Sequence, residues 1–161
     1  MAPLPQLDQP AINFALPDGD KRVVNLKDFR GKNVVLAFFP ADWSPTCTSE
    51  LALIQETLAD IRAYNAEVIA VSVDNVWSHK AWVQQKKFEF PLLSDFWPHG
   101  EVSSQYGVFL DEAGTANRAL FFIDAEGVVR DRWVAESPGM APARSVIIGA
   151  LEKMKAGSHA R

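Results

Sequence analysis

A chain of 161 residues with 48% apolar and 22% charged residues has the composition of a folded domain rather than of a disordered segment, and we expect one domain over residues 1–161. The net charge of −4 gives no basic footprint, which argues against nucleic acid or an anionic membrane surface as a partner. No apolar run in the sequence approaches the ~20 residues needed to span a bilayer.

The chain opens with a proline-containing stretch, residues 1–10, which we expect to be an extended lead-in. Weak alternation on both sides of Pro17-Asp18-Gly19 predicts an N-terminal β-hairpin over residues 12–26, with Gly19 able to take a positive φ in the turn. Strand and helix patterns follow. The predicted strands are 34–39, 68–73, 92–94, 119–123 and 128–133. The predicted helices run from near Cys47 to 64–65, over 76–87, from Pro98 to Gly107, and over 142–155, before a tail at 157–161.

The order of these elements predicts how they pack. Residues 68–73 are apolar without alternation, which is typical of a parallel strand covered on both faces. Right-handed crossovers place this strand beside 34–39. We therefore predict an α/β protein with a thioredoxin-like fold, in which a central mixed sheet is flanked by helices and preceded by the N-terminal hairpin.

Cys47 is the only cysteine, and it lies where a buried strand gives way to a helix. Apolar residues recur at helical spacing directly after it, at Leu51, Ile54, Leu58 and Ile61. Unpaired backbone N–H groups and the positive end of the helix dipole gather at such a junction, and both favour a thiolate over a thiol. Cys47 is thus a candidate nucleophile; the alternative is a buried, inert thiol.

The residues around Cys47 also match a known pattern. Pro40, Ser44 and Cys47 fit the peroxiredoxin signature Pro-x-x-x-Thr/Ser-x-x-Cys. Further segments match in the same order, at 91–100, 106–109 and 116–121. From about Ile12 to the C-terminal helix, the chain resembles the one-cysteine alkyl hydroperoxide reductase E group of bacterial peroxiredoxins.

The resemblance implies a role for each residue of the signature. Cys47 attacks a peroxide oxygen, the Ser44 hydroxyl hydrogen-bonds the substrate, and Pro40 shields the sulfur from water. An arginine from a distant strand completes the site in this family, and Arg118 holds that position here, with a solvated strand end as its alternative reading.

Two further residues are supporting candidates. Glu50 corresponds to a position that often orients the arginine in this family, but it could equally be a surface acid favoured by the helix dipole. Trp43 lies in the loop before the helix, where it could wall the pocket or meet a partner subunit. His79, His99 and His159 lack metal-ligand spacing, so we expect neither a metal nor another cofactor.

We therefore predict a thiol-dependent peroxidase that reduces hydrogen peroxide or organic hydroperoxides through a sulfenic acid at Cys47. Two-cysteine relatives often carry a second thiol five residues later, where this chain has Ala52. Recycling then needs an external thiol: a low-molecular-weight thiol, a thioredoxin or a glutaredoxin-like protein. The resemblance implies a homodimer. A single cysteine and an N-terminus without a signal-peptide pattern favour the cytoplasm.

Two alternatives belong to other functional classes. The loop from Trp43 to Cys47 is similar to the Trp-Cys-x-x-Cys loop of thioredoxin-type disulfide oxidoreductases, but Ser44 stands where the attacking cysteine would be. The second alternative is a non-enzymatic redox sensor or holdase on the same scaffold.

Overall fold

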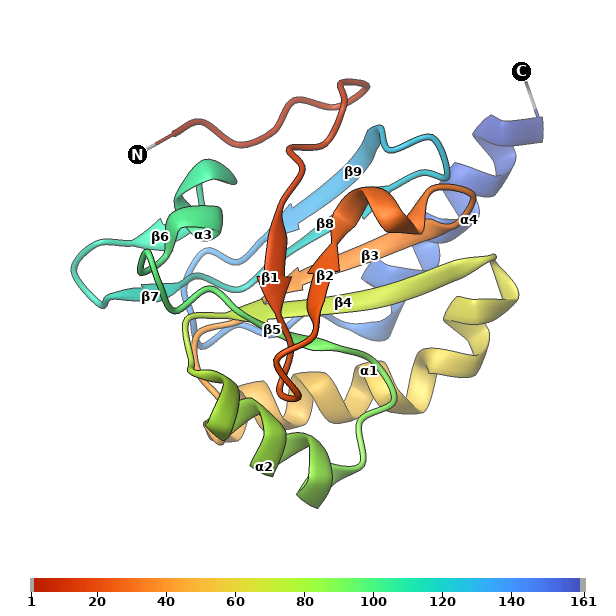
Figure 1. Ribbon diagram of the computed structural model, residues 1–161. Helices are drawn as coiled ribbons and strands as arrows, with labels where there is room; N and C mark the ends of the chain where they lie inside the picture. Colours follow the sequence, from red (N-terminus) through yellow and green to blue (C-terminus); the bar gives the residue numbers. More distant parts are fainter. Residues whose placement is uncertain (1, 160–161) are drawn as a thin grey trace.

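A five-stranded mixed sheet forms the centre of the computed structural model, which describes residues 2–159 and the side chains of residues 2–157 (Figure 1). The strand order is β5-β4-β3-β8-β9. In that order the strands are Leu92–Ser94, Ala66–Ser72, Asn33–Phe38, Ala119–Ile123 and Val129–Val134. Strands β3, β4 and β5 are parallel, whereas β8 and β9 run antiparallel to their neighbours. The predicted central mixed sheet is confirmed, as is the parallel pairing of β3 with β4.

The remaining elements cover the two faces of this sheet. The helices are α1 (Pro45–Ala63), α2 (Val76–Lys86), α3 (Glu101–Gln105) and α4 (Arg144–His159), with a 3₁₀ helix η1 (Leu26–Phe29). Along β3, Val35 and Ala37 face a core shared with α1, α2 and α4. The alternate residues Val34, Leu36 and Phe38 face a second core shared with the N-terminal segment and α3. Two-sided burial of this kind explains why β3 and β4 are almost continuously apolar.

The N-terminal hairpin pairs β1 (Ala15–Pro17) with β2 (Val23–Asn25) and lies in front of the sheet in Figure 1. Its strands are shorter than predicted, and the positive φ in the turn belongs to Lys21 (63°) rather than to Gly19. Gly19 is instead constrained by close approach, because a Cβ there would lie 2.9 Å from the Lys80 backbone in α2. The predicted turn is confirmed, but the prediction that Gly19 takes the positive φ was wrong.

The structure differs from the prediction in three other places. The helix expected to open at Pro98 begins at Glu101, because residues 96–100 form turns and Gly100 caps α3 in a left-handed conformation (φ 72°). The short strands β6 (Phe109–Leu110) and β7 (Thr115–Ala116) were not predicted. Helix α4 continues through residues 157–159 of the predicted tail, and residues 160–161 lie outside the described part.

The direction of β8 decides what meets at one edge of the sheet. Phe38, the last residue of β3, pairs with Ala119, the first residue of β8. The loop that follows β3 and the residue that precedes β8 therefore lie side by side. Among residues 2–159, no helix has both the length and the apolar character needed to cross a bilayer.

Candidate active site

The first turn of α1 positions the cysteine. Ser44 is the N-cap residue, and its Oγ accepts a hydrogen bond of 3.1 Å from the backbone N–H of Cys47. Pro45 occupies the first helical turn, where a missing N–H costs nothing. The Thr48 hydroxyl donates to the Ser44 carbonyl at 2.8 Å and so also stabilises the start of the helix. Cys47 thus lies within the helix N-terminus, where the dipole favours negative charge.

Arg118 reaches the sulfur from the start of β8. Its Nη1 lies 3.2 Å from Cys47 Sγ and 2.8 Å from Glu50 Oε1. Its Nε and Nη2 both donate to the Pro138 carbonyl, at 3.0 and 2.6 Å. The Arg118 side chain is only 2% exposed, so its donors are oriented by hydrogen bonds to the protein rather than by water. The alternative that Arg118 is a solvated residue at the end of a strand is therefore wrong.

The charges in this cluster are coupled. Burial raises the pKa of Glu50 above its ordinary value, although the hydrogen bond and charge of Arg118 oppose the shift. Burial alone would lower the pKa of Arg118, but hydrogen bonds to Glu50 and Cys47 outweigh it and raise that pKa. The guanidinium therefore stays charged. Within the described residues, Glu50 Oε2 has no hydrogen-bond partner, which makes a protonated Glu50 easier to accommodate.

The sulfur belongs to a buried residue. Cys47 has no exposed surface and packs within the core that includes Phe39 and Leu51. Pro40 directly follows β3 and is half-buried in the loop that leads to the cysteine. A reactant can reach Sγ only if the surrounding segments open locally. The Pro138 carbonyl that holds Arg118 lies on an exposed segment, residues 136–141.

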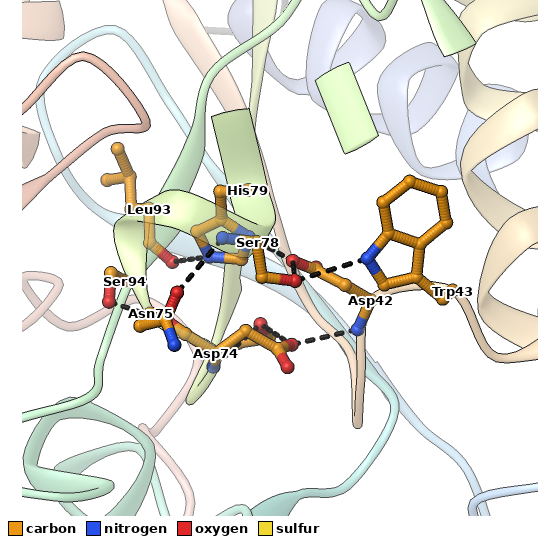
Figure 2. A network of polar contacts seen from close by, with 9 residues as sticks. Asp42, Trp43, Asp74, Asn75, Ser78, His79, Leu93 and Ser94 are labelled. Carbon is orange, nitrogen blue, oxygen red and sulfur yellow. Dashed lines mark hydrogen bonds and ion pairs between the residues drawn. The ribbon is translucent and has the colours of Figure 1, made fainter. Parts of the chain in front are cut away.

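Trp43 lies beside this cluster but faces α2. Its backbone is left-handed (φ 72°), and its indole Nε1 donates to Ser78 Oγ at 3.2 Å. The ring centroid lies 6.1 Å from that of Trp82, and the side chain is 47% exposed. Trp43 therefore borders the loop from the side of α2, where Figure 2 shows it within a polar network.

Among the side chains of residues 2–157, that network contains the one histidine that contacts acidic groups. His79, Asp42 and Asp74 each bring one ligand-type atom within 4.8 Å of the others, a proximity that sequence spacing did not reveal. One oxygen of each carboxylate is engaged in hydrogen bonds, whereas the buried Asp42 Oδ1 has no partner within the described residues. Asp74 Oδ2 accepts from the Asp42 backbone N–H and from Ser72 Oγ. Asp42 Oδ2 contacts Ser78 Oγ and His79 Nδ1. The hydrogen bonds between these side chains form a buried polar network.

Sequence reasoning missed two groups that hold Arg118. Pro138 supplies a backbone carbonyl, which no side-chain pattern reveals. Asn117 accepts from the Arg118 backbone N–H at 2.8 Å and donates to the Ala135 carbonyl at 3.0 Å. The only signal for Asn117 was its place directly before Arg118.

Comparisons with known proteins agree with this geometry. The model of the AhpC/TSA family matches residues 7–132. Alkyl hydroperoxide reductase E of Mycobacterium tuberculosis is 44% identical over 121 residues, covering 74% of this chain and 79% of that one. Peroxiredoxin-2 of Rattus norvegicus is 37% identical over 142 residues, covering 82% and 71%.

Two solved structures of peroxiredoxins have a similar fold. The crystal structure of Enterococcus faecalis AhpC aligns with a TM-score of 0.87 at 29% identity, covering 97% of this chain and 96% of that one. The reduced 2-Cys peroxiredoxin of Plasmodium vivax aligns with a TM-score of 0.85. The predicted thioredoxin-like fold is confirmed. With a family match over most of its length and relatives above 30% identity, the chain belongs to the AhpC/TSA family of peroxiredoxins.

Proposed function

We propose that this chain is a thiol-dependent peroxidase of the 1-Cys type, with Cys47 as its reacting group. The observation that carries the proposal is the 3.2 Å contact between Arg118 Nη1 and Cys47 Sγ at a helix N-terminus. A fixed positive charge beside the sulfur favours the thiolate, which is the nucleophilic form. Family membership supports the peroxidase activity itself.

The reaction follows from these groups. The Cys47 thiolate attacks the terminal oxygen of a hydroperoxide, so that an S–O bond forms while the O–O bond breaks. The departing oxygen leaves as alkoxide or hydroxide and takes a proton, which gives an alcohol or water. The sulfur is oxidised to sulfenic acid and the peroxide is reduced.

Each neighbouring residue has a part in this scheme. Arg118 steadies charge on the peroxide oxygens, with Glu50 and the Pro138 carbonyl fixing the plane of its guanidinium. Ser44 uses a lone pair of Oγ for the helix cap, which leaves its O–H able to donate to the substrate. Pro40 limits water near the sulfur. Because Cys47 is buried, peroxide entry accompanies a local opening of the site.

Recycling depends on a second thiol that the chain does not carry. With one cysteine in the sequence and Ala52 in α1 where some relatives have a resolving thiol, sulfenic acid must react with an external thiol. A low-molecular-weight thiol, a thioredoxin or a glutaredoxin-like protein would serve. We further propose that the enzyme works as a homodimer in the cytoplasm.

Intact-mass measurement after one equivalent of peroxide tests the proposal. The wild-type chain should gain the mass of one oxygen atom, and Cys47→Ser should gain none. Without reductant the chain should turn over once and then overoxidise at higher peroxide, whereas an added thiol should sustain turnover. Continued peroxide consumption without reductant, or equal oxidation of Cys47→Ser, would refute it.

The same experiment separates the enzyme from a redox sensor. Fast formation of sulfenic acid at low peroxide followed by reduction with thiols is the enzymatic result. Slow oxidation that changes the binding of another protein would favour the sensor. Dithiol exchange is disfavoured, since Ser44 cannot supply the attacking thiolate.

A further inference from the structure

A buried polar network ties the loop before the reactive cysteine to the opposite helix, and its centre is a histidine–carboxylate pair. His79, in α2, is fully buried, and its Nδ1 lies 2.7 Å from Oδ2 of Asp42 (Figure 2). The other ring nitrogen, Nε2, lies 3.0 Å from the carbonyl oxygen of Leu93 in β5. The proposed mechanism uses neither His79 nor Asp42.

The hydrogen-bond partners fix where the protons lie. A carbonyl only accepts, so Nε2 of His79 carries a hydrogen towards Leu93. Ser78 Oγ accepts from the indole of Trp43, which leaves its own proton to donate to Asp42 Oδ2 at 2.9 Å. The 2.7 Å contact between Nδ1 and Oδ2 must then hold one proton. Without this proton, a lone pair on Nδ1 and a lone pair on Oδ2 would face each other across 2.7 Å, which is repulsive.

Either position of that proton leaves the pair with no net charge, as an imidazolium–carboxylate or as a neutral imidazole and carboxylic acid. Burial raises the pKa of Asp42, while the hydrogen bond and charge of His79 oppose the rise. Both forms keep the same hydrogen bond. The pair therefore provides a buried link that neither water nor a surface ion interrupts.

The link continues along the backbone to the cysteine. The Asp42 backbone N–H donates to Asp74 Oδ2 at 2.8 Å, and Asp74 is itself held by Ser72 Oγ at 2.6 Å. The next residue, Trp43, is left-handed and anchored through its indole. The residue after that is Ser44, whose hydroxyl caps the helix at the reactive cysteine. Three consecutive residues thus connect the proton-sharing pair to the helix cap.

We propose that His79 is a positioning residue for the peroxidase site: it shares one proton with Asp42, and this pair holds residues 42–44 in the conformation that presents Ser44 to Cys47. The expected effect of this pair on the rate of peroxide reduction rests on the proposed function. The sharing of one proton between His79 and Asp42 does not depend on that function.

Variants of the pair test the proposal. His79→Gln removes the second ring nitrogen, and Asp42→Asn removes the group that can share the proton. Each should slow the second-order oxidation of Cys47 by peroxide about tenfold or more, because small displacements of reacting groups are costly. Since the two residues act as one unit, the double variant should be no more than about threefold slower than the slower single variant. His99→Gln is the matched control, because both nitrogens of this exposed histidine contact only carbonyl oxygens. It should oxidise at the wild-type rate.

A spectroscopic measurement separates positioning from mere stability. In histidine-selective NMR, wild type and Cys47→Ser should both show a protected, strongly hydrogen-bonded proton between Nδ1 of His79 and Asp42, and Asp42→Asn should lose it. Wild-type oxidation rates in folded His79→Gln, rate losses that multiply in the double variant, or an unbonded Nδ1 in wild type would each overturn the proposal.

The design also keeps the two proposals apart. If wild-type Cys47 fails to react quickly with peroxide, the proposed function fails, yet the NMR signal and the rates of Cys47 alkylation by iodoacetamide still test the pair. If oxidation is fast and His79→Gln leaves it unchanged, only the positioning role fails.

Discussion

Replacing Arg118 with lysine keeps the positive charge and removes the fork of donors. The guanidinium uses three nitrogens, with Nη1 shared between Cys47 Sγ and Glu50 Oε1 and the other two on the Pro138 carbonyl. A lysine ammonium is a single nitrogen and cannot satisfy groups on both sides. It should settle on the carboxylate of Glu50, the strongest acceptor, and leave the sulfur and the carbonyl without it.

The expected loss follows from the one bond to sulfur. A hydrogen bond involving a charged group contributes about 1.5–3 kcal/mol. Since about 1.4 kcal/mol corresponds to a tenfold change in rate, Arg118→Lys should react with peroxide roughly 10- to 150-fold more slowly. The variant should still fold, because Glu50 keeps a cationic partner and is not left as an unpaired buried charge.

Rapid mixing with peroxide, quenching by an alkylating agent and mass spectrometry of the remaining thiol measures this rate. Arg130→Lys is the matched control: Arg130, on β9, pairs with Asp8 and Asp124, and none of its hydrogen bonds reaches a site residue. Oxidation of Arg118→Lys within about threefold of wild type, with an unchanged melting temperature, would show that the charge alone suffices and that the fork is not needed.

Substitutions at three further positions, with controls, test the helix cap, the buried acid and the turn before α3. Ser44→Ala should lower the free energy of unfolding by about 1 kcal/mol in urea, whereas Ser44→Thr should keep most of it, because only the alanine variant lacks the capping oxygen. Glu50→Gln should remove a pH dependence. Since folding raises the pKa of Glu50, the folded state binds the proton more tightly, and the stability from this group falls as pH rises above about 4.5. The unfolding free energy of wild type relative to Glu50→Gln should therefore decrease from pH 4.5 towards neutrality. Gly100→Ala should cost about 2 kcal/mol or more, since φ is 72° and the new Cβ would lie 2.3 Å from the Phe109 ring. Gly149→Ala, in open space on α4, should be stabilising by about 0.5–1 kcal/mol.

Specific outcomes would contradict each of these. Equal stability of Ser44→Ala and Ser44→Thr would show that the capping oxygen of residue 44 does not stabilise the protein. A pH-independent difference between Glu50 and its glutamine variant would mean that the carboxyl titrates alike in the folded and unfolded chain. Similar melting temperatures for the two glycine variants would show that the Gly100 backbone adapts freely.

The sequence predicted the elements whose signal is local. Strand β4 and helix α1 are long, apolar on the correct faces, and bounded by residues that end or cap them, so their patterns need no partner to be interpreted. The cap of α2 is a local contact as well, because the Asn75 side chain accepts from the backbone N–H of Ser78 three residues on. These local rules placed Cys47 at the helix start.

Features that depend on distant contacts could not be predicted in this way. In the N-terminal hairpin the left-handed residue is Lys21, while Gly19 lies against the Lys80 backbone in α2, and neither feature shows in the local sequence pattern. The two-residue strands β6 and β7 are too short to show a period.

His79 looked isolated in the sequence for the same reason, because its carboxylate partner lies 37 residues earlier. One signal was available: Asp42 follows β3 and His79 lies one turn into the helix after β4. The carboxyl ends of parallel neighbours share one edge of the sheet.

The separation of Cys47 from Arg118 by 71 residues has a consequence for synthesis. At about 5–20 residues per second, the ribosome adds the arginine roughly 4–14 s after the cysteine. During that interval the nascent chain carries a sulfhydryl without its guanidinium neighbour. The contact on which the proposed reactivity of Cys47 depends therefore forms late, when β8 docks against β3.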